Sequence, residues 1–362
     1  MTRGNAALSV AGLGAVGVAL LAAATVCVSS GCSTIGYYAQ SVGGHLAIVR
    51  AARPVPDWLA DEHTGAALKA RLELSQRIRD FAVSDLHEPD NASYRRYADL
   101  KRAAAVWNVV AAPELSLKLQ TWCFAVVGCV GYRGYYDQAE ANAFADGLRA
   151  QGLDVSVYGV PAYSTLGLLP GDALKDSLLN TFIDYPEGEL ARLIFHELAH
   201  QIAYAKGDTV FNESFATAVE RLGAQRWLSE RAGAPARAEY EQVEARRHDF
   251  GTLTRRYRDR FQALYDSAAS DDDKRRAKAA LLADLRVDYE TMKRERWGGF
   301  SGYDGWFARA NNASFGVLAA YNQLVPNFER LFEREGRDWS AFYAEVKRLA
   351  ALPVVERRNA LP

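Results

Sequence analysis

The segment His196-Glu197-Leu198-Ala199-His200 constrains the fold of this 362-residue chain more than any other. Two imidazoles four residues apart lie on one face of an α-helix, and in that arrangement both can bind a single metal ion. Apolar residues recur at helical spacing around the motif: Leu190, Leu193, Ile194, Leu198 and Ile202. The pattern therefore predicts a packed helix that presents two metal ligands.

Start and stop signals flank this predicted helix. Asp184 and Glu187 form a capping-box pattern, with Pro186 in the first turn. Gly207 stands where a C-terminal stop belongs. We therefore expect a helix with defined ends, and a rigid helix is a suitable platform for a metal site.

A third ligand is expected from the helix that follows. Asn212 is a suitable N-cap for a helix over residues 213–230. Catalytic zinc has three protein ligands and an open position, and two histidines with one glutamate are a known set. Glu213 is the best-placed candidate, and Glu220, two turns further on, is the alternative ligand. If Glu213 is the ligand, Glu220 and Asn212 are expected to lie outside the ligand set and to hold the ligands in position, for example by orienting a histidine.

Glu197 is the remaining polar residue of the motif. In a helical motif of this type it faces the water on the metal, so it can act as the general base that activates zinc-bound water. We therefore predict peptide-bond hydrolysis that depends on one Zn²⁺ ion. A further donor to the oxyanion is expected from a tyrosine, with these candidates: Tyr163, Tyr204 and Tyr321.

Residues 155–169 form the strand-like stretch nearest the motif on its N-terminal side. Zinc peptidases commonly hold the substrate by adding it as a strand to a sheet edge. Ala162 and Tyr163 are therefore candidate substrate-binding residues. The alternative is an ordinary core strand.

The paired segments at 196–201 (HELAHQ) and 212–220 (NESFATAVE) resemble the core of the gluzincin aminopeptidases, which reads HELAHQ and then NEGFA. That resemblance implies the zinc ligands and the base residue by residue: His196, His200, Glu213 and Glu197. The spacing departs from that family, because the twelve residues between His200 and Glu213 are fewer than usual there. Its Gly-x-Met-Glu-Asn segment, which binds the substrate's free α-amine, is missing. The available acids are Asp172, Asp176 and Asp184.

A larger share of the chain resembles a bacterial family of lipoproteins described as predicted aminopeptidases. The resembling stretches are 32–38, 122–124, 132–136, 162–167, the zinc region and 310–313. The resemblance implies an aminopeptidase. Two other functions stay open: a periplasmic endopeptidase, and a non-catalytic lipoprotein that binds or scaffolds and in which zinc only joins two helices.

The N-terminus differs in character from the rest of the chain. Residues 6–28 carry no charge, and residues 28–33 (VSSGCS) resemble a bacterial lipobox, although Ser29 replaces the usual Leu. The resemblance implies a signal peptide over 1–31 and a lipid on Cys32. Because Ser33 is not the Asp that favours inner-membrane retention, we expect the outer membrane, facing the periplasm. An anchor in the inner membrane is the alternative.

Composition places the remaining chain among ordinary globular proteins. It is 49% apolar and 24% charged, with a net charge of −1, so a nucleic-acid partner has no electrostatic support. Export leaves Cys123 and Cys129 as an even pair in an oxidising compartment, which favours a disulfide. The alternative is two buried thiols.

We expect one zinc-peptidase-like domain over residues 32–362, of the α+β class and mostly helical. Apolar spacing predicts helices over residues 37–110. A small β-rich unit next to the zinc-binding helix pair should follow, with a helix capped by Asp137 and Glu140 and closed by Gly152. From about residue 235 to 362 the chain reads as charged helices, with a break at 267–273.

Overall fold

The computed structural model describes residues 36–124, 128–162 and 175–362, without the side chains of 319–322. The chain forms two compact units, residues 1–47 and 48–362. Of the first unit, residues 36–47 are described, and they are helical. The predicted signal peptide and the lipidation site Cys32 lie outside the described residues. Within the described part, no helix has the length and apolar character needed to cross a bilayer.

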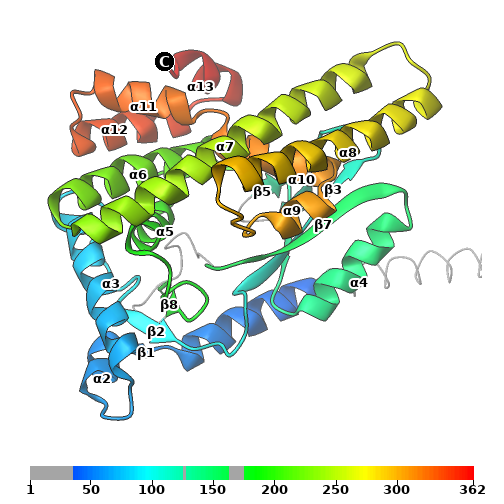
Figure 1. The fold of residues 1–362 in the computed structure, drawn as a ribbon. Helices are drawn as coiled ribbons and strands as arrows, with labels where there is room; N and C mark the ends of the chain where they lie inside the picture. Colours follow the sequence, from blue (N-terminus) through cyan, green and yellow to red (C-terminus); the bar gives the residue numbers. More distant parts are fainter. Residues whose placement is uncertain (1–35, 125–127, 163–174) are drawn as a thin grey trace, which may run out of the picture. The chain divides into compact units, whose positions relative to one another are not determined.

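The second unit is α+β and mostly helical, as predicted (Figure 1). Its first elements are β1 (Arg53–Pro54), α2 (Val55–Ala60), α3 (Ala66–Ser84), β2 (Arg96–Ala98) and β3 (Val106–Pro113). The β-rich part continues with β4 (Trp122–Phe124), β5 (Gly128–Val130), β6 (Arg133–Tyr135), α4 (Gln138–Arg149), β7 (Leu153–Val160) and β8 (Leu178–Leu179). The helical part contains α5 (Glu187–Ala199), α6 (Thr209–Glu230), α7 (Ala234–Asp266), α8 (Asp271–Arg296), α9 (Asp304–Arg309), α10 (Asn312–Asn322), α11 (Val325–Arg334), α12 (Trp339–Ala350) and α13 (Val354–Ala360).

The main sheet has the antiparallel order β6-β3-β7. Its central strand β3 is a run of apolar, β-prone residues that are buried on both sides, including Val109, Val110 and Ala112. The prediction of helices over residues 37–110 is therefore wrong for β1, β2 and β3. Helical spacing holds only as far as α3, because a continuous apolar run does not distinguish a buried strand from a helix.

The small helix of the β-rich unit follows its sequence signals. The carboxylate of Asp137 accepts a hydrogen bond from the backbone N–H of Glu140 at 2.9 Å, which caps α4. Gly152 follows the helix with φ of +80°, a conformation that favours glycine. The predictions of the cap, of the closing glycine and of the following strand β7 are confirmed.

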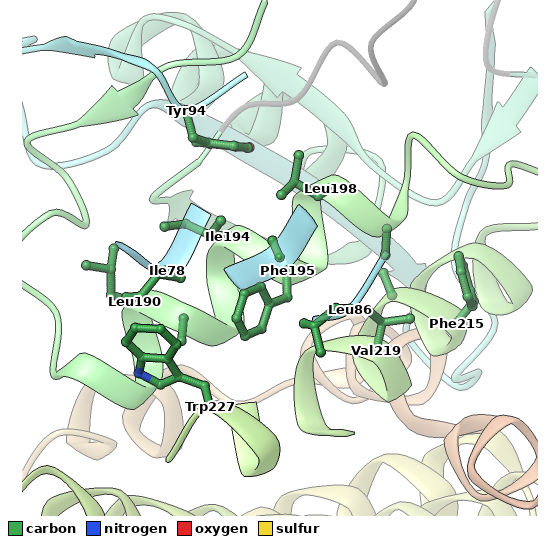
Figure 2. Close-up of a cluster of buried hydrophobic side chains, with 14 of the residues drawn as sticks. Ile78, Leu86, Tyr94, Leu190, Ile194, Phe195, Leu198, Phe215, Val219 and Trp227 are labelled. Atoms are coloured by element: carbon green, nitrogen blue, oxygen red, sulfur yellow. The ribbon is translucent and has the colours of Figure 1, made fainter. Parts of the chain in front are cut away.

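The core is built around α5, which packs against α6 and α3. Figure 2 shows Leu190, Ile194, Phe195 and Leu198 of α5 facing apolar side chains of both neighbours. Each of these four side chains is fully buried. The α5–α6 pair is therefore fixed by close apolar packing, and polar groups that it carries are held in defined positions.

Both helices begin at residues other than those predicted. Helix α5 starts at Glu187 after Pro186, so the expected cap at Asp184 is wrong. Helix α6 starts at Thr209, where Asp208 caps it by accepting a hydrogen bond from the N–H of Phe211 at 3.1 Å. The expected cap at Asn212 is therefore wrong, because an equally suitable cap residue stands four positions earlier.

The C-terminal helices agree with the predicted pattern. Helices α7 and α8 are long and charged, and the chain breaks between them at residues 267–270. They pack on each other around a second apolar cluster that includes Tyr257, Phe261 and Leu285. Their arginines pair with acids on the surface, for example Arg256 with Asp288.

Candidate metal centre

The two helices of the core bring together the three residues that the motif singles out. His196 lies in the last turn of α5, His200 caps its C-terminal end, and Glu213 lies in the first part of α6. The two Nε2 atoms are 3.2 Å apart. A carboxylate oxygen of Glu213 lies 3.3 Å from Nε2 of His196 and 3.7 Å from Nε2 of His200. Three ligand atoms therefore face one point.

These separations fit a zinc ion. Ligand atoms placed tetrahedrally at about 2.0–2.2 Å from zinc lie about 3.3–3.6 Å from one another. The three observed separations fall at or near this range. Among the described residues, this is the one cluster of three or more His, Cys, Asp or Glu side chains with metal-ligand spacing.

The charges of the three ligands are strongly coupled. Burial raises the pKa of Glu213, but the neighbouring His200 and His196 lower it far more, so that it ends well below its usual value. Burial lowers the pKa of His196, but hydrogen bonds to Glu213 and Glu220 raise it well above its usual value. The cluster therefore holds a proton at His196, and a cation that binds here displaces it.

Glu220 contacts the other ring nitrogen of His196. Its carboxylate accepts a hydrogen bond from Nδ1 at 2.9 Å, so Nε2 faces the ligand cluster and can bind a cation once its proton is displaced. Burial raises the pKa of Glu220, but the charge of Arg192 and the contact with His196 have the larger, opposite effect and lower the pKa to about 2. Arg192 pairs with Glu220 and also with Glu244 of α7. Glu220 therefore contacts His196 from its Nδ1 side and is not part of the cluster of His196, His200 and Glu213.

Glu197 faces open space beside the ligands. It lines a polar cavity of about 340 Å³, together with Tyr185, Glu189, Arg192, Leu193, His196, Thr217, Glu220 and Arg247. Burial raises the pKa of Glu197, the two histidines lower it, and the charges of Asp176 and Glu213 raise it again, so the pKa ends above its usual value. A carboxylate with a raised pKa next to a metal position can accept and return a proton.

Asn212 supports the site through the backbone. Its side chain accepts a hydrogen bond from the N–H of Ala205 at 2.7 Å and donates one to the carbonyl of the same residue at 2.9 Å. It also hydrogen-bonds Tyr204. Asn212 therefore holds the connection between α5 and α6 in place. This positions the adjacent Glu213 next to the two histidines.

Tyrosines and acids around the site differ from those expected. Tyr163 and Asp172 lie outside the described residues, and so does the side chain of Tyr321. Tyr204, one of the candidate donors, lies near Glu213. Tyr132, which the sequence reasoning missed, lies near both Glu213 and Glu197. Its setting between Gly131 and Gly134, in a segment already matched to the lipoprotein family, was the available signal.

Two of the three acids named for amine binding can be placed. Asp176 is buried, and its charge raises the pKa of Glu197. The charge of Asp184 instead raises the pKa of Arg71, against the effect of burial. Asp176 also accepts a hydrogen bond from Gln201 at 3.4 Å, just beyond the second histidine. Of these acids, Asp176 is therefore the one associated with the site.

The strand expected to bind substrate ends earlier than predicted. Strand β7 stops at Val160, so Ala162 lies beyond its end and packs against the main core cluster. In the described sheet, β7 pairs with β3 alone and is an edge strand. Tyr163 cannot be placed. The edge strand therefore consists of residues 153–160, and the carbonyl of Val155 within it already accepts a hydrogen bond from Asn311 at 3.1 Å.

A disulfide joins Cys123 and Cys129 across the β4–β5 pair. This hairpin approaches the chain before α6, because a Cβ atom on Gly128 would lie 3.0 Å from the backbone nitrogen of Gly207. Both glycines have positive φ, +80° and +77°. The close contact places the hairpin directly against the turn that leads to Glu213.

Comparison with known proteins identifies a family. The sequence model of a family described as "Putative aminopeptidase" matches residues 36–361. No curated protein matches the chain, and no solved structure does. The match covers nearly all of the chain, including both helices of the candidate metal centre.

Proposed function

The chain belongs to the "Putative aminopeptidase" family, and from this premise we propose that it hydrolyses peptide bonds with the help of one zinc ion. The observation that supports zinc is the convergence of His196, His200 and Glu213, with separations of 3.2, 3.3 and 3.7 Å. Three ligands of this kind leave a coordination position open, as catalytic zinc requires.

A zinc ion held by these residues would supply a Lewis acid that lowers the pKa of a bound water towards about 7 and polarises the substrate carbonyl. The chain itself supplies the orientation of the ligands. Glu220 holds the ring of His196 through Nδ1, and Arg192 holds Glu220. Asn212 holds the turn from which Glu213 projects.

Glu197 is the proposed general base. It accepts a proton from the attacking water and passes it to the leaving amine, while its raised pKa suits both transfers. Tyr132 and Tyr204 lie near Glu213 and are the described tyrosines able to donate to the oxyanion. Asp176 is the acid proposed to attract a free α-amine, which would make the enzyme an aminopeptidase.

We propose that a lipid on Cys32 holds the enzyme at the outer membrane, facing the periplasm. The support is the lipobox resemblance of residues 28–33. Membrane fractionation of the wild type and of Cys32→Ser tests it: the wild type should sediment with outer membranes and the variant should be released. Sedimentation with inner membranes contradicts the proposed location.

The proposed chemistry is tested with the Glu197→Gln variant. We expect it to keep one zinc per chain and to lose about 10²- to 10⁴-fold in peptide hydrolysis. Glu290→Gln, on the exposed surface of α8, is the matched control and should retain activity. If Glu197→Gln keeps both metal and full activity, the assignment of the base is wrong. If the zinc-loaded wild type cleaves no peptide, the proposed function is wrong.

The aminopeptidase specificity has its own test. Peptides with a free N-terminus should be cleaved, and the same peptides with an acetylated N-terminus should not. Undiminished cleavage of the acetylated peptides would identify an endopeptidase.

A further inference from the structure

A second cavity, of about 280 Å³, lies at the N-terminal end of α6. It is enclosed by β3, β7, α10, the start of α6 and the segments around residues 117–121 and 129–132. Most of its surface is apolar, from Val110, Leu117, Leu119, Tyr132, Tyr158 and Val317. Several of these side chains also form one packed cluster with Ala112 and Ala313, so the wall is a fixed part of the fold.

None of the described residues that line this cavity presents a free charge. Asp208 is the one charged residue among them, and its carboxylate is already engaged. It pairs with Arg357 and Arg358 and caps α6 through the N–H of Phe211. A charged group that entered the cavity would therefore lose its hydration without gaining a partner, whereas an apolar group would gain from burial.

The cavity lies on the same face of α6 as the metal centre. Val210, Glu213, Thr217 and Glu220 follow each other at intervals of three and four residues, so they share one helix face. Val210 lines the apolar cavity, Glu213 is a proposed ligand, and Thr217 lines the polar cavity beside Glu197. The two cavities therefore flank the ligand cluster along α6.

The distance along this face matches a short stretch of peptide. Val210 and Thr217 are seven residues apart, which is about 10 Å along a helix. An extended peptide advances about 3.3 Å per residue, so about three residues reach from one cavity to the other. Tyr132 connects the two regions, because it lines the apolar cavity and lies near Glu213 and Glu197, whose charges add to the effect of burial in raising its pKa.

We propose that the apolar cavity beside Val210 binds an apolar side chain of the peptide substrate next to the scissile bond. This inference rests on the proposed peptidase function and adds the substrate class: peptides with an aliphatic or aromatic residue on that side. A volume of about 280 Å³ is just below the range of about 300–1,000 Å³ that drug-sized ligands occupy, so it suits one large side chain.

Val317→Trp tests the inference by filling the cavity, and Leu119→Ala tests it by enlarging the cavity. In the wild type, kcat/KM should be about 10- to 100-fold higher for peptides with Leu or Phe at the position next to the scissile bond, on the side of the apolar cavity, than for peptides with Asp or Lys there. Val317→Trp should remove most of this preference but still cleave Ala peptides. Leu119→Ala should shift the preference from Leu towards Phe. Val287→Trp, on the exposed surface of α8, is the matched control and should change nothing.

A binding measurement separates this inference from the proposed function. Methyl resonances of Val317 and Leu119 should shift in wild-type protein titrated with N-acetylleucinamide, and should not shift with N-acetylglycinamide. Methyl shifts without any peptide hydrolysis would support the cavity and contradict the peptidase. Hydrolysis without side-chain preference, or with a preference that Val317→Trp leaves intact, overturns the inference alone. If the protein shows neither hydrolysis nor methyl shifts, both the inference and the proposed function are wrong.

Discussion

The helix pairs α5–α6 and α7–α8 place the same kinds of charged residue in opposite environments. The side chains of Arg192 and Glu220, on α5 and α6, are only 7% and 14% exposed. Those of Arg256 and Asp288, on α7 and α8, are 57% and 43% exposed. Ion pairs in water contribute little, whereas a buried charge needs a partner at a fixed position.

The difference in burial indicates a different role for the charged residues of each helix pair. Replacing buried ion pairs with apolar residues of similar volume often stabilises a fold, so burial alone gives α5 and α6 no reason to carry these charges. On these helices, Arg192 pairs with Glu220, and Glu220 accepts a hydrogen bond from His196, one of the proposed ligands. On α7 and α8, the exposed pair of Arg256 and Asp288 contacts none of the proposed ligands among the described residues. The comparison therefore predicts large effects at the first pair and small effects at the second.

The largest effect is expected for Arg192→Met. The substitution leaves the buried carboxylate of Glu220 without its arginine partner, whereas Glu244 is 31% exposed and keeps its pair with Arg247. We expect a loss of about 3–5 kcal/mol in the free energy of unfolding, measured by urea denaturation. A loss below 1 kcal/mol would show that this pair behaves like a surface pair, and the contrast between the two regions would disappear.

A smaller effect is expected for Glu220→Gln, and it concerns the metal more than the fold. The neutral amide can still accept a hydrogen bond from Nδ1 of His196, but it no longer makes the ring more basic. We expect zinc affinity to fall by about 10- to 100-fold, measured by competition with a chelating dye. Glu230→Gln, at the exposed end of the same helix, is the control. Equal affinities would exclude the proposed support of the ligand.

A pH-dependent effect is expected for Glu88→Gln. Glu88 is 3% exposed, and neither carboxylate oxygen has a hydrogen-bond partner among the described residues. Burial raises its pKa well above 4.5, against the opposing charges of Arg79 and His196.

The sign follows from the direction of that shift. Below about pH 4.5 Glu88 is neutral in both states and costs nothing. As the pH rises above that value, the unfolded state ionises and the folded state does not, so stability is lost until the folded pKa is passed. Thermal denaturation should show Glu88→Gln equal to the wild type near pH 4 and relatively more stable near pH 8. The opposite trend would mean that Glu88 is ionised and paired in the folded protein.

The smallest effect is expected for Arg256→Ala on α7. Its partner Asp288 also accepts a hydrogen bond from Tyr257, so the acid keeps one contact. We expect a change of less than about 1 kcal/mol in the free energy of unfolding and no change in hydrolysis. A larger loss would indicate that the α7–α8 pair has a structural role that its exposure does not suggest.

Local sequence patterns predicted the local features of the fold well. The spacing of His196 and His200, the apolar face of α5 and the cap at Asp137 each depend on residues close together in the chain. Nearby alternatives were harder to rank: Asp208 and Asn212 are both good helix caps, but Asp208 caps α6, and the side chain of Asn212 bonds the backbone of Ala205 instead. The strand β3 was missed because its apolar run is buried on both sides.

Features that depend on long-range packing could not be predicted in the same way. Tyr132 comes from the β-rich unit, more than sixty residues before the metal motif, and the sheet brings it to Glu213. The pairing of Arg192 with Glu220 and Glu244 joins three helices. The apolar cavity is formed by segments from residue 110 to residue 317, so no single stretch of sequence indicates it.

X-ray absorption at the zinc edge of the purified full chain tests the central claim most directly. We predict one zinc ion per chain, with nitrogen and oxygen ligands at about 2.0–2.2 Å and the scattering pattern of two imidazoles. The Glu213→Ala variant should bind zinc much more weakly. A chain without zinc, or a spectrum with sulfur ligands at about 2.3 Å, would contradict the metal centre formed by His196, His200 and Glu213.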